Sequence, residues 1–117
     1  MSYEAATYLF NEFLENNDNN DCLQFFRRSP QAYLLMLVIY IYQVQGLDLS
    51  LSEIYKKIPD KITSDLTLFN LIKDAEDAGY IIKTQNPNDS RSVKITFKSE
   101  SFNGISEWLS NLEIKKK

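Results

Sequence analysis

The sequence has no histidine, one cysteine and three glycines among its 117 residues. Without histidine there is no imidazole for acid–base catalysis, for a catalytic triad or for a metal site. The single cysteine, Cys22, forms no intramolecular disulfide. With no histidine beside it, one cysteine supports neither a zinc site nor a conventional cysteine nucleophile. So few glycines exclude a glycine-rich phosphate-binding loop. We therefore expect a protein that is not an enzyme and holds no cofactor or metal.

Long apolar runs are also missing. The most apolar segment, Tyr33 to Tyr42, is about half the roughly 20 residues needed to cross a bilayer, so we interpret it as a buried helix. The first residues lack the basic and apolar segments of a signal peptide. These absences, together with the lone cysteine, predict a cytoplasmic protein with no membrane partner.

The composition is that of one globular domain, with 44% hydrophobic and 13% aromatic residues. The net charge of −3 and the pI of about 4.9 argue mildly against nucleic-acid binding. Charge is uneven, however, because residues 80–98 carry four basic side chains and only one acidic side chain, Asp89. A modest positive excess therefore lies in one segment of an acidic chain.

The N-terminal part predicts an amphipathic helix followed by a break. Apolar residues recur at helical spacing in its first turns: Ala6, Leu9, Phe10, Phe13 and Leu14. The Asn/Asp tract at 16–21 is interpreted as a solvated connection, because these side chains compete with the helix backbone for hydrogen bonds. A short helical piece is expected around residues 23–27.

Two clear start signals follow. Ser29 before a proline predicts a helix over 30–45 that is apolar nearly all round, which is typical of a central helix. Ser50 and Glu53 form a capping box, which predicts a short helix over 51–58. A further helix is expected to begin at Thr63 or Ser64 and to end near Gly79.

The period then changes from helical to alternating. We expect strands over 80–84 and 92–97, a turn at 86–89, and a last amphipathic helix over 102–112. Helices followed directly by a hairpin predict a mainly α (α+β) winged helix-turn-helix with a two-stranded wing and a helix at each end. An ordinary α+β domain with a hairpin on its edge is the alternative. The expected single domain of 1–117 comprises an N-terminal helical extension (1–28), a winged-helix core (29–98), a C-terminal helix (99–114) and a frayed tail (115–117).

Residues 49–98 resemble the MarR family of bacterial transcription regulators. The run DSRSVKITF at 89–97 resembles the wing signature of that family, and LSLSEI at 49–54 resembles the start of its helix-turn-helix. The resemblance implies sequence-specific binding of double-stranded DNA by a dimeric transcription regulator. It also implies that Asp89 orients Arg91 and that Arg91 reaches the DNA backbone or a narrow minor groove. By the residues alone, the same pair is also compatible with a surface turn holding a local ion pair worth about a few tenths of a kcal/mol.

The resemblance places the helix at 63–78 in the major groove. Ser64, Thr67 and Asn70 are expected to hydrogen-bond bases or phosphates, and Asn suits adenine. Many family members carry arginine where this chain has Asn70 and Asp74, and we interpret Asp74 and Asp77 as a solvated face. The residues predicted to contact DNA are Lys61, Thr63, Ser64, Thr67, Asn70, Lys73, Arg91 and Lys94, with further phosphate contacts from Lys56 and Lys57.

The two ends predict a homodimer. The family usually has two helices after the wing that build its dimer interface, whereas about 15 residues follow Ser99 here before the lysine tail. Dimerisation would therefore use the N- and C-terminal helices, whose many aromatic rings otherwise cap the domain's own core. A small-molecule effector would bind in the cleft between the end helices and the winged core, although no residue demands one. Alternative functions are a plasmid or phage segregation or replication protein on the same fold, and a winged-helix protein–protein adaptor.

Overall fold

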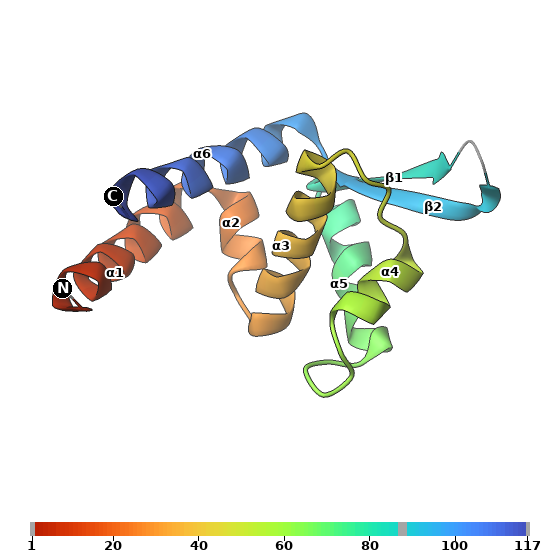
Figure 1. The fold of residues 1–117 in the computed structure, drawn as a ribbon, viewed down its shortest axis with the longest axis horizontal. Coiled ribbons are helices and arrows are strands. Elements are labelled where there is room, and N and C mark those ends of the chain that lie inside the picture. The colour runs from red at the N-terminus through yellow and green to blue at the C-terminus, as the bar shows by residue number, and fades with distance from the viewer. Residues whose placement is uncertain (1, 87–88, 117) are drawn as a thin grey trace.

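The computed structural model describes the backbone of residues 2–86 and 89–116, and the side chains of these residues apart from 16–19, 86–92 and 113–116. Within these ranges the chain forms six helices and one two-stranded sheet (Figure 1). The order of elements confirms the predicted winged helix-turn-helix. The elements are α1 (Ser2–Asn19), α2 (Asp21–Phe26), α3 (Pro30–Val44), α4 (Leu51–Lys57), α5 (Asp65–Asp77), β1 (Ile81–Asn86), β2 (Asp89–Phe97) and α6 (Ser99–Lys116).

Serine caps begin the three central helices; those at Ser29 and Ser50 were predicted, and the third, at Ser64, is one of the two predicted starts of its helix. The Ser29 hydroxyl accepts the Ala32 amide of α3, and the Ser64 hydroxyl accepts the Thr67 amide of α5, each at 3.1 Å. The Ser50 hydroxyl accepts the Glu53 amide at 3.3 Å, which is half of the predicted capping box. The Glu53 carboxylate lies toward the Tyr42 hydroxyl and Lys56 instead. Side-chain acceptors at these positions satisfy amides that have no partner within the helix.

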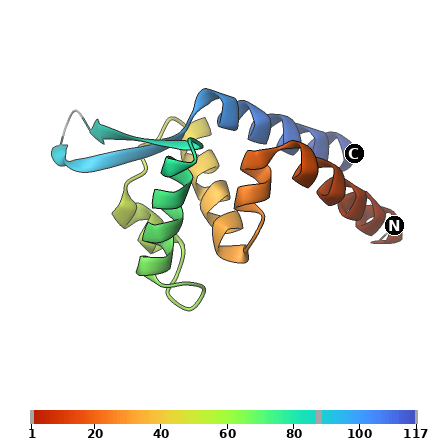
Figure 2. The ribbon, with the colours of Figure 1, turned by 180° about the vertical axis from the view of Figure 1, so that it is seen from behind.

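The core surrounds α3, which lies in the middle of the molecule (Figures 1 and 2). Leu35, Met36 and Ile39 of this helix are fully buried. Buried side chains from the neighbouring elements close around them: Leu23, Phe26, Ile54, Leu68, Ile72, Ile81, Ile95 and Phe97. An apolar helix packed on several sides is what the sequence of 30–45 predicts.

The wing is an antiparallel hairpin whose root is tied to the helices. Ile81 pairs with Phe97, and both are buried on the side that faces the core. The Gln43 side chain of α3 bridges the Phe97 backbone, because its carbonyl accepts the Phe97 amide at 2.7 Å and its amide donates to the Phe97 carbonyl at 3.4 Å. The Ile95 amide donates to the Leu49 carbonyl at 2.9 Å, in the loop before α4. The hairpin is therefore attached on both sides at its base.

The strands are longer than predicted. β1 extends to Asn86 and β2 begins at Asp89, so two of the four residues assigned to the turn are paired strand residues. The register shifts between Gln85 and Asn86. Cross-strand hydrogen bonding can include Asn and Asp at the end of a ladder, which the composition of the turn does not reveal. Residues 87–88 lie outside the described residues.

The predicted connection at 16–21 is wrong. α1 continues through this tract to Asn19, and only Asn20 interrupts the helices. The Asn20 side chain accepts the Leu23 amide at 3.1 Å and so caps α2. Asn is unfavourable inside a helix but is favoured at such a cap, so a single residue suffices for the break.

The C-terminal helix is also longer than predicted. α6 begins at Ser99 and runs to Lys116, through most of the segment that was expected to be a frayed tail. Basic side chains near a helix C-terminus interact favourably with the helix dipole, which favours this extension. Lys117 lies outside the described residues.

α1 stands out from the rest of the molecule as an arm beneath α6 (Figures 1 and 2). The radius of gyration is 15.1 Å, against about 13 Å expected for a compact domain of this length. In the part of the chain that the structure describes, no helix has the length and apolar character required to span a membrane.

Candidate nucleic-acid interface

The outward face of α5 is a row of four exposed side chains that ends in a carboxylate. Leu66, Asn70, Lys73 and Asp77 follow one another at spacings of four, three and four residues, which places them on one side of a helix. The opposite side is buried, as predicted, by Leu68, Leu71, Ile72 and Ala75. Figure 2 shows α5 on the near side of the body, with the hairpin extending from its C-terminal end. This row is therefore available to a partner that approaches the helix.

The start of α5 combines two hydroxyls. The Ser64 hydroxyl lies 3.0 Å from the Thr67 hydroxyl, and both residues are exposed. Thr63 is only 7% exposed, so little of its side chain is accessible, and its contact with DNA stays a prediction. Its amide donates to the Pro59 carbonyl at 3.4 Å. Ser64 and Thr67 remain at the surface.

The carboxylates at the C-terminal end of α5 have basic neighbours. Asp74 lies 3.9 Å from Arg28, in the connection between α2 and α3. Glu76 lies 3.3 Å from the Lys83 ammonium of β1. Exposed pairs of this kind add little stability, but they reduce the negative field at this end of the helix. Arg28 also stacks over the Phe25 ring at 4.2 Å, which holds the guanidinium beside α5.

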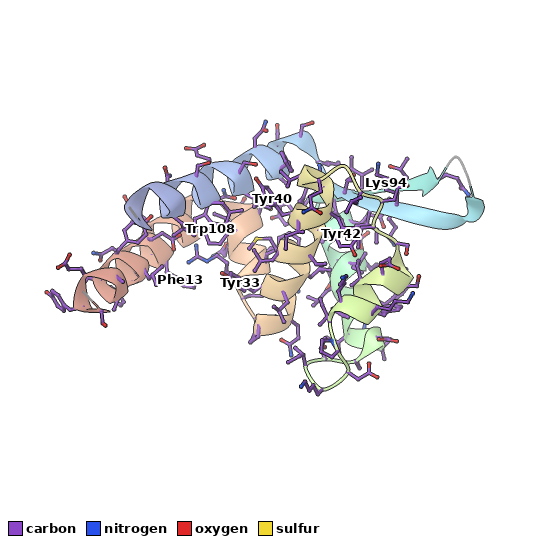
Figure 3. The ribbon with its side chains drawn as sticks, in the orientation of Figure 1. Phe13, Tyr33, Tyr40, Tyr42, Lys94 and Trp108 are labelled. Atoms are coloured by element: carbon purple, nitrogen blue, oxygen red, sulfur yellow. The ribbon has the colours of Figure 1, made fainter. Side chains whose placement is uncertain are left out.

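The lysines that were expected to meet phosphates divide into two groups. Lys56, Lys57 and Lys61 are exposed near the turn between α4 and α5. Lys94 is partly buried on the wing, and its ammonium lies 3.3 Å from Asp48 (Figure 3). Lys94 would have to leave this carboxylate to contact DNA, so its predicted role is weaker than that of the exposed lysines.

The predicted contact pair Asp89 and Arg91 lies at the far end of the hairpin. Their backbone belongs to β2, which extends away from the body (Figure 1). Their side chains lie outside the described residues, so the orientation of Arg91 by Asp89 stays a prediction.

Three apolar side chains at this surface were not foreseen. Leu66 is 68% exposed, and Ile62 and Phe69 are each 42% exposed. The Lys83 ammonium lies 5.9 Å from the centre of the Phe69 ring. A helical projection places Leu66 between Asn70 and Lys73, so the spacing alone would have revealed it.

A buried ion pair fastens α1 to the rest of the molecule. Arg27, which follows α2, donates to both Glu12 oxygens at 2.7 and 3.0 Å, and the two side chains are 8% and 4% exposed. The guanidinium also stacks on the Phe13 and Trp108 rings, at 4.4 and 5.2 Å from their centres (Figure 3). Three helices therefore meet at Arg27. Since Glu12 and Arg27 are 15 residues apart, local spacing gave no indication of the pair.

Apolar side chains remain exposed on both α1 and α3. On α1 they are Tyr3, Leu9, Phe10, Phe13 and Leu14, and on α3 they are Tyr33, Ile41 and Val44. Tyr33 also meets the Trp108 ring of α6 edge-on, with centres 6.4 Å apart (Figure 3). The α1 residues include four of the five that form the predicted amphipathic face, and these have not been absorbed into the core.

An open cleft of about 360 Å³ lies where α2, α5, β1 and α6 meet. Its lining is Asn20, Asp21, Cys22, Ala78, Gly79, Tyr80, Glu100 and Ser101. Gly79 turns the chain from α5 into β1 with a φ of +86°, a conformation that favours glycine. Burial raises the pKa of the Cys22 thiol to about 11, and a hydrogen bond with Ser101 offsets part of this effect. The thiol is therefore protonated and unreactive near neutral pH.

Comparison with solved structures shows the same architecture in several proteins. The chain is similar to MepR from S. aureus in complex with DNA, at 14% identity over 97% of this chain and 86% of that chain, with a TM-score of 0.63. It is similar to NadR in complex with 4-hydroxyphenylacetate, at 11% identity over 97% and 74% of the chains, with a TM-score of 0.60.

A third similar structure is the heme sensor protein PefR from Streptococcus agalactiae in complex with heme. Its identity is 19% over 98% of this chain and 72% of that chain, with a TM-score of 0.53. No protein-family model matches the sequence, and no curated protein matches it. At identities of this size a likeness establishes the fold, and the chain has the winged-helix fold of the MarR-family regulators.

Proposed function

We propose that this chain binds double-stranded DNA sequence-specifically and regulates transcription, with α5 in the major groove and the hairpin beside it. The observation that carries the proposal is the outward row on α5, presented next to a hairpin whose root is bonded to α3. The major groove admits an α-helix, and a helix-turn-helix presents its second helix there. The likeness in fold to MepR, which was solved in complex with DNA, supports this function.

Each exposed residue has a defined role in the proposal. Asn70 suits adenine, and the hydroxyls of Ser64 and Thr67 suit bases or phosphates. Lys61 and Lys73 bind phosphates, as do Lys56 and Lys57. Arg91, oriented by Asp89, reaches the adjacent minor groove, and Lys94 adds a backbone contact after separating from Asp48. The pairing of Asp74 with Arg28 supports this arrangement, because it offsets one of the exposed carboxylates of α5.

We further propose that the protein is a homodimer through α1 and α6. The support is the exposed apolar face of α1, which a second copy would cover. A two-fold dimer would bind a pseudo-palindromic site with half-sites one helical turn apart. The mass measured by sedimentation equilibrium should therefore be twice that of the chain.

An effector site and a location complete the proposal. A small-molecule effector would bind between the end helices and the winged core, where the cleft next to Cys22 and Tyr80 lies. NadR and PefR, two neighbours in fold, were solved with 4-hydroxyphenylacetate and with heme. We propose a cytoplasmic location, which the free thiol of Cys22 supports.

The proposal is tested by titrating a labelled random-sequence duplex with the full chain at two salt concentrations. Binding should weaken steeply with salt, because cationic side chains release counterions from DNA. Arg91→Ala should weaken binding to all duplexes and reduce the salt slope by about 1. Asn70→Ala should alter sequence preference, whereas Asn103→Ala, an exposed position on α6, should change neither property. Absence of duplex binding at low salt would refute the function.

A protein–protein adaptor is the second candidate. The observation that favours it is the exposure of Ile62, Leu66 and Phe69 at the same surface as four carboxylates of α5. An adaptor would bind a partner protein through this surface and would not bind duplexes in the salt titration. A segregation or replication protein of a plasmid or phage would share the DNA-binding result, and its binding site would lie at an origin or partition locus.

A further inference from the structure

Leu66 occupies an unusual position for an apolar side chain. At 68% it is the most exposed large hydrophobic residue among those that the structure describes between 29 and 98. It also lies at the centre of the outward face of α5, with the buried residues Leu68 and Ile72 on the opposite side. Such a side chain gains stability only when a partner covers it, and the proposed DNA contact surface runs through this position.

The neighbours of Leu66 define what the partner presents. Asn70 lies one turn further along the same row, and Lys73 lies one turn beyond Asn70. The rise of a helix separates Leu66 from Asn70 by about 6 Å, which corresponds to about two base-pair steps of 3.4 Å. The part of the row from Leu66 to Lys73, before the Asp77 carboxylate, therefore matches a polar, anionic partner that displays isolated methyl groups.

The major groove of an A·T base pair has this character. Adenine presents the N7 acceptor and the N6 donor that suit an asparagine side chain, and thymine presents a C5-methyl group. Cytosine at the same position lacks the methyl group and presents an amino donor in place of the O4 acceptor of thymine, so the methyl group is what distinguishes thymine for an apolar side chain. The row on α5 thus combines an asparagine, Asn70, which suits adenine, with an apolar side chain, Leu66, which suits the methyl group of thymine.

We infer that Leu66 contacts the C5-methyl group of a thymine in each half-site and so makes thymine preferred over cytosine there. The inference rests on the proposed function, because it assigns specificity to the same surface. Arg28 and Lys83 offset two of the four carboxylates of α5, Asp74 and Glu76, and Lys73 and Lys61 stay exposed, which favours DNA over a protein partner at the part of this face between Leu66 and Lys73. The contact adds a methyl-reading position to a row that otherwise recognises hydrogen-bonding groups.

The test removes the methyl group and nothing else. A preferred duplex is first selected from a random-sequence pool with the full chain. Each thymine of the half-site is then replaced singly by deoxyuridine, which keeps the base pair and the O4 acceptor. Fluorescence anisotropy should show about fourfold weaker binding of the wild-type chain at one position, as expected for the loss of one buried methyl group. Replacement of that thymine by 5-methylcytosine, paired with guanine, should bind more tightly than replacement by cytosine.

Two variants assign the effect to Leu66. Leu66→Ala should bind the thymine and deoxyuridine duplexes equally, and its exposure means that folding is retained. Leu47→Ala alters a leucine that is 51% exposed in the loop between α3 and α4, and it should keep the fourfold difference.

The outcomes separate the inference from the function on which it rests. Salt-sensitive duplex binding with no effect of deoxyuridine at any position would overturn the inference and leave the proposed function intact. A deoxyuridine effect that persists in Leu66→Ala would overturn it as well. No duplex binding at low salt would overturn both, and the exposed Leu66 would then belong to a protein-binding surface.

Discussion

The winged-helix body (residues 21–97, with α6 packed on it through Ile105 and Trp108) and the arm formed by α1 are held in place by different chemistry. The body closes over side chains such as Leu35 and Ile39 that have no exposed surface. The arm is attached through the charged pair of Glu12 and Arg27 and leaves apolar residues of α1, such as Phe10, in solvent. Apolar burial stabilises a fold without help from a partner, whereas an exposed apolar helix gains stability when it is covered. The body therefore buries its apolar residues within one chain, whereas the arm leaves several of them exposed.

The strongest test of the body is Phe26→Ala. Phe26 is fully buried, and its ring meets Phe97 edge-on with centres 5.6 Å apart, which joins α2 to the wing. Truncation of a buried phenylalanine should lower the free energy of unfolding by about 4 kcal/mol, measured by urea denaturation. Phe69→Ala removes the same ring from an exposed site and should cost less than about 1 kcal/mol. Equal losses of unfolding free energy in the two variants would mean that burial of the Phe26 ring does not stabilise the body.

The arm is broken most directly by Arg27→Ala. This change leaves the Glu12 carboxylate buried without its guanidinium, which should cost about 3 kcal/mol. Trp108 is the only tryptophan and lies over Arg27, so its fluorescence reports on the arm while circular dichroism reports on all helices. In Arg27→Ala the fluorescence transition in urea should precede the dichroism transition.

The adjacent arginine provides the control for this prediction. Arg28 is half-exposed and lies 3.9 Å from Asp74, so Arg28→Ala should change stability by only about 0.5 kcal/mol. Replacing Glu12 and Arg27 together by leucine and methionine should recover most of the loss, because two buried charges then disappear at once. Coincident transitions in Arg27→Ala would show that the arm and the body unfold as one unit.

A smaller effect is expected where the wing meets α3. Gln43→Ala removes both hydrogen bonds to the Phe97 backbone and should cost about 2 kcal/mol, since the Phe97 amide loses its acceptor. Hydrogen exchange at the Phe97 amide should become faster. Gln45→Ala, at the exposed end of α3, should leave the free energy of unfolding and the exchange rate of the Phe97 amide unchanged. Unaltered exchange in Gln43→Ala would show that the root is held by the sheet alone.

A further test concerns pH and Cys22, which lies in α2 beside α6. Burial raises the pKa of its thiol from 9.0 to about 11, so the folded state keeps the proton at a pH where the unfolded state releases it. The stabilisation is complete below pH 9 and is lost as the pH rises toward 11. The difference in unfolding free energy between the wild type and Cys22→Ala should therefore shrink over this range. A constant difference would mean that the thiol titrates normally in the fold.

Local signals predicted the body well and the arm poorly. Serine caps at Ser29, Ser50 and Ser64, with the alternation at 92–97, were sufficient to place α3, α4, α5 and the wing, because each signal acts within a few residues. The pairing of Glu12 with Arg27 and of Lys94 with Asp48 joins residues far apart in the chain, and no local pattern encodes it.

In the candidate site, too, the features set by local sequence were predicted and those set by distant contacts were not. The exposed face of α5 was foreseen from its period, including Asn70 and Lys73. Burial of Thr63 was not foreseen, because it depends on how the loop after α4 folds back. The side chains of Asp89 and Arg91 stay a prediction from the resemblance.

The double attachment of the hairpin root has a mechanical consequence. Gln43 of α3 holds the hairpin root on one side, and Leu49, before α4, holds it on the other. The hairpin is therefore fixed at its base and extends freely from there. A small rotation of α3 would be magnified at the tip, which lies farthest from this base.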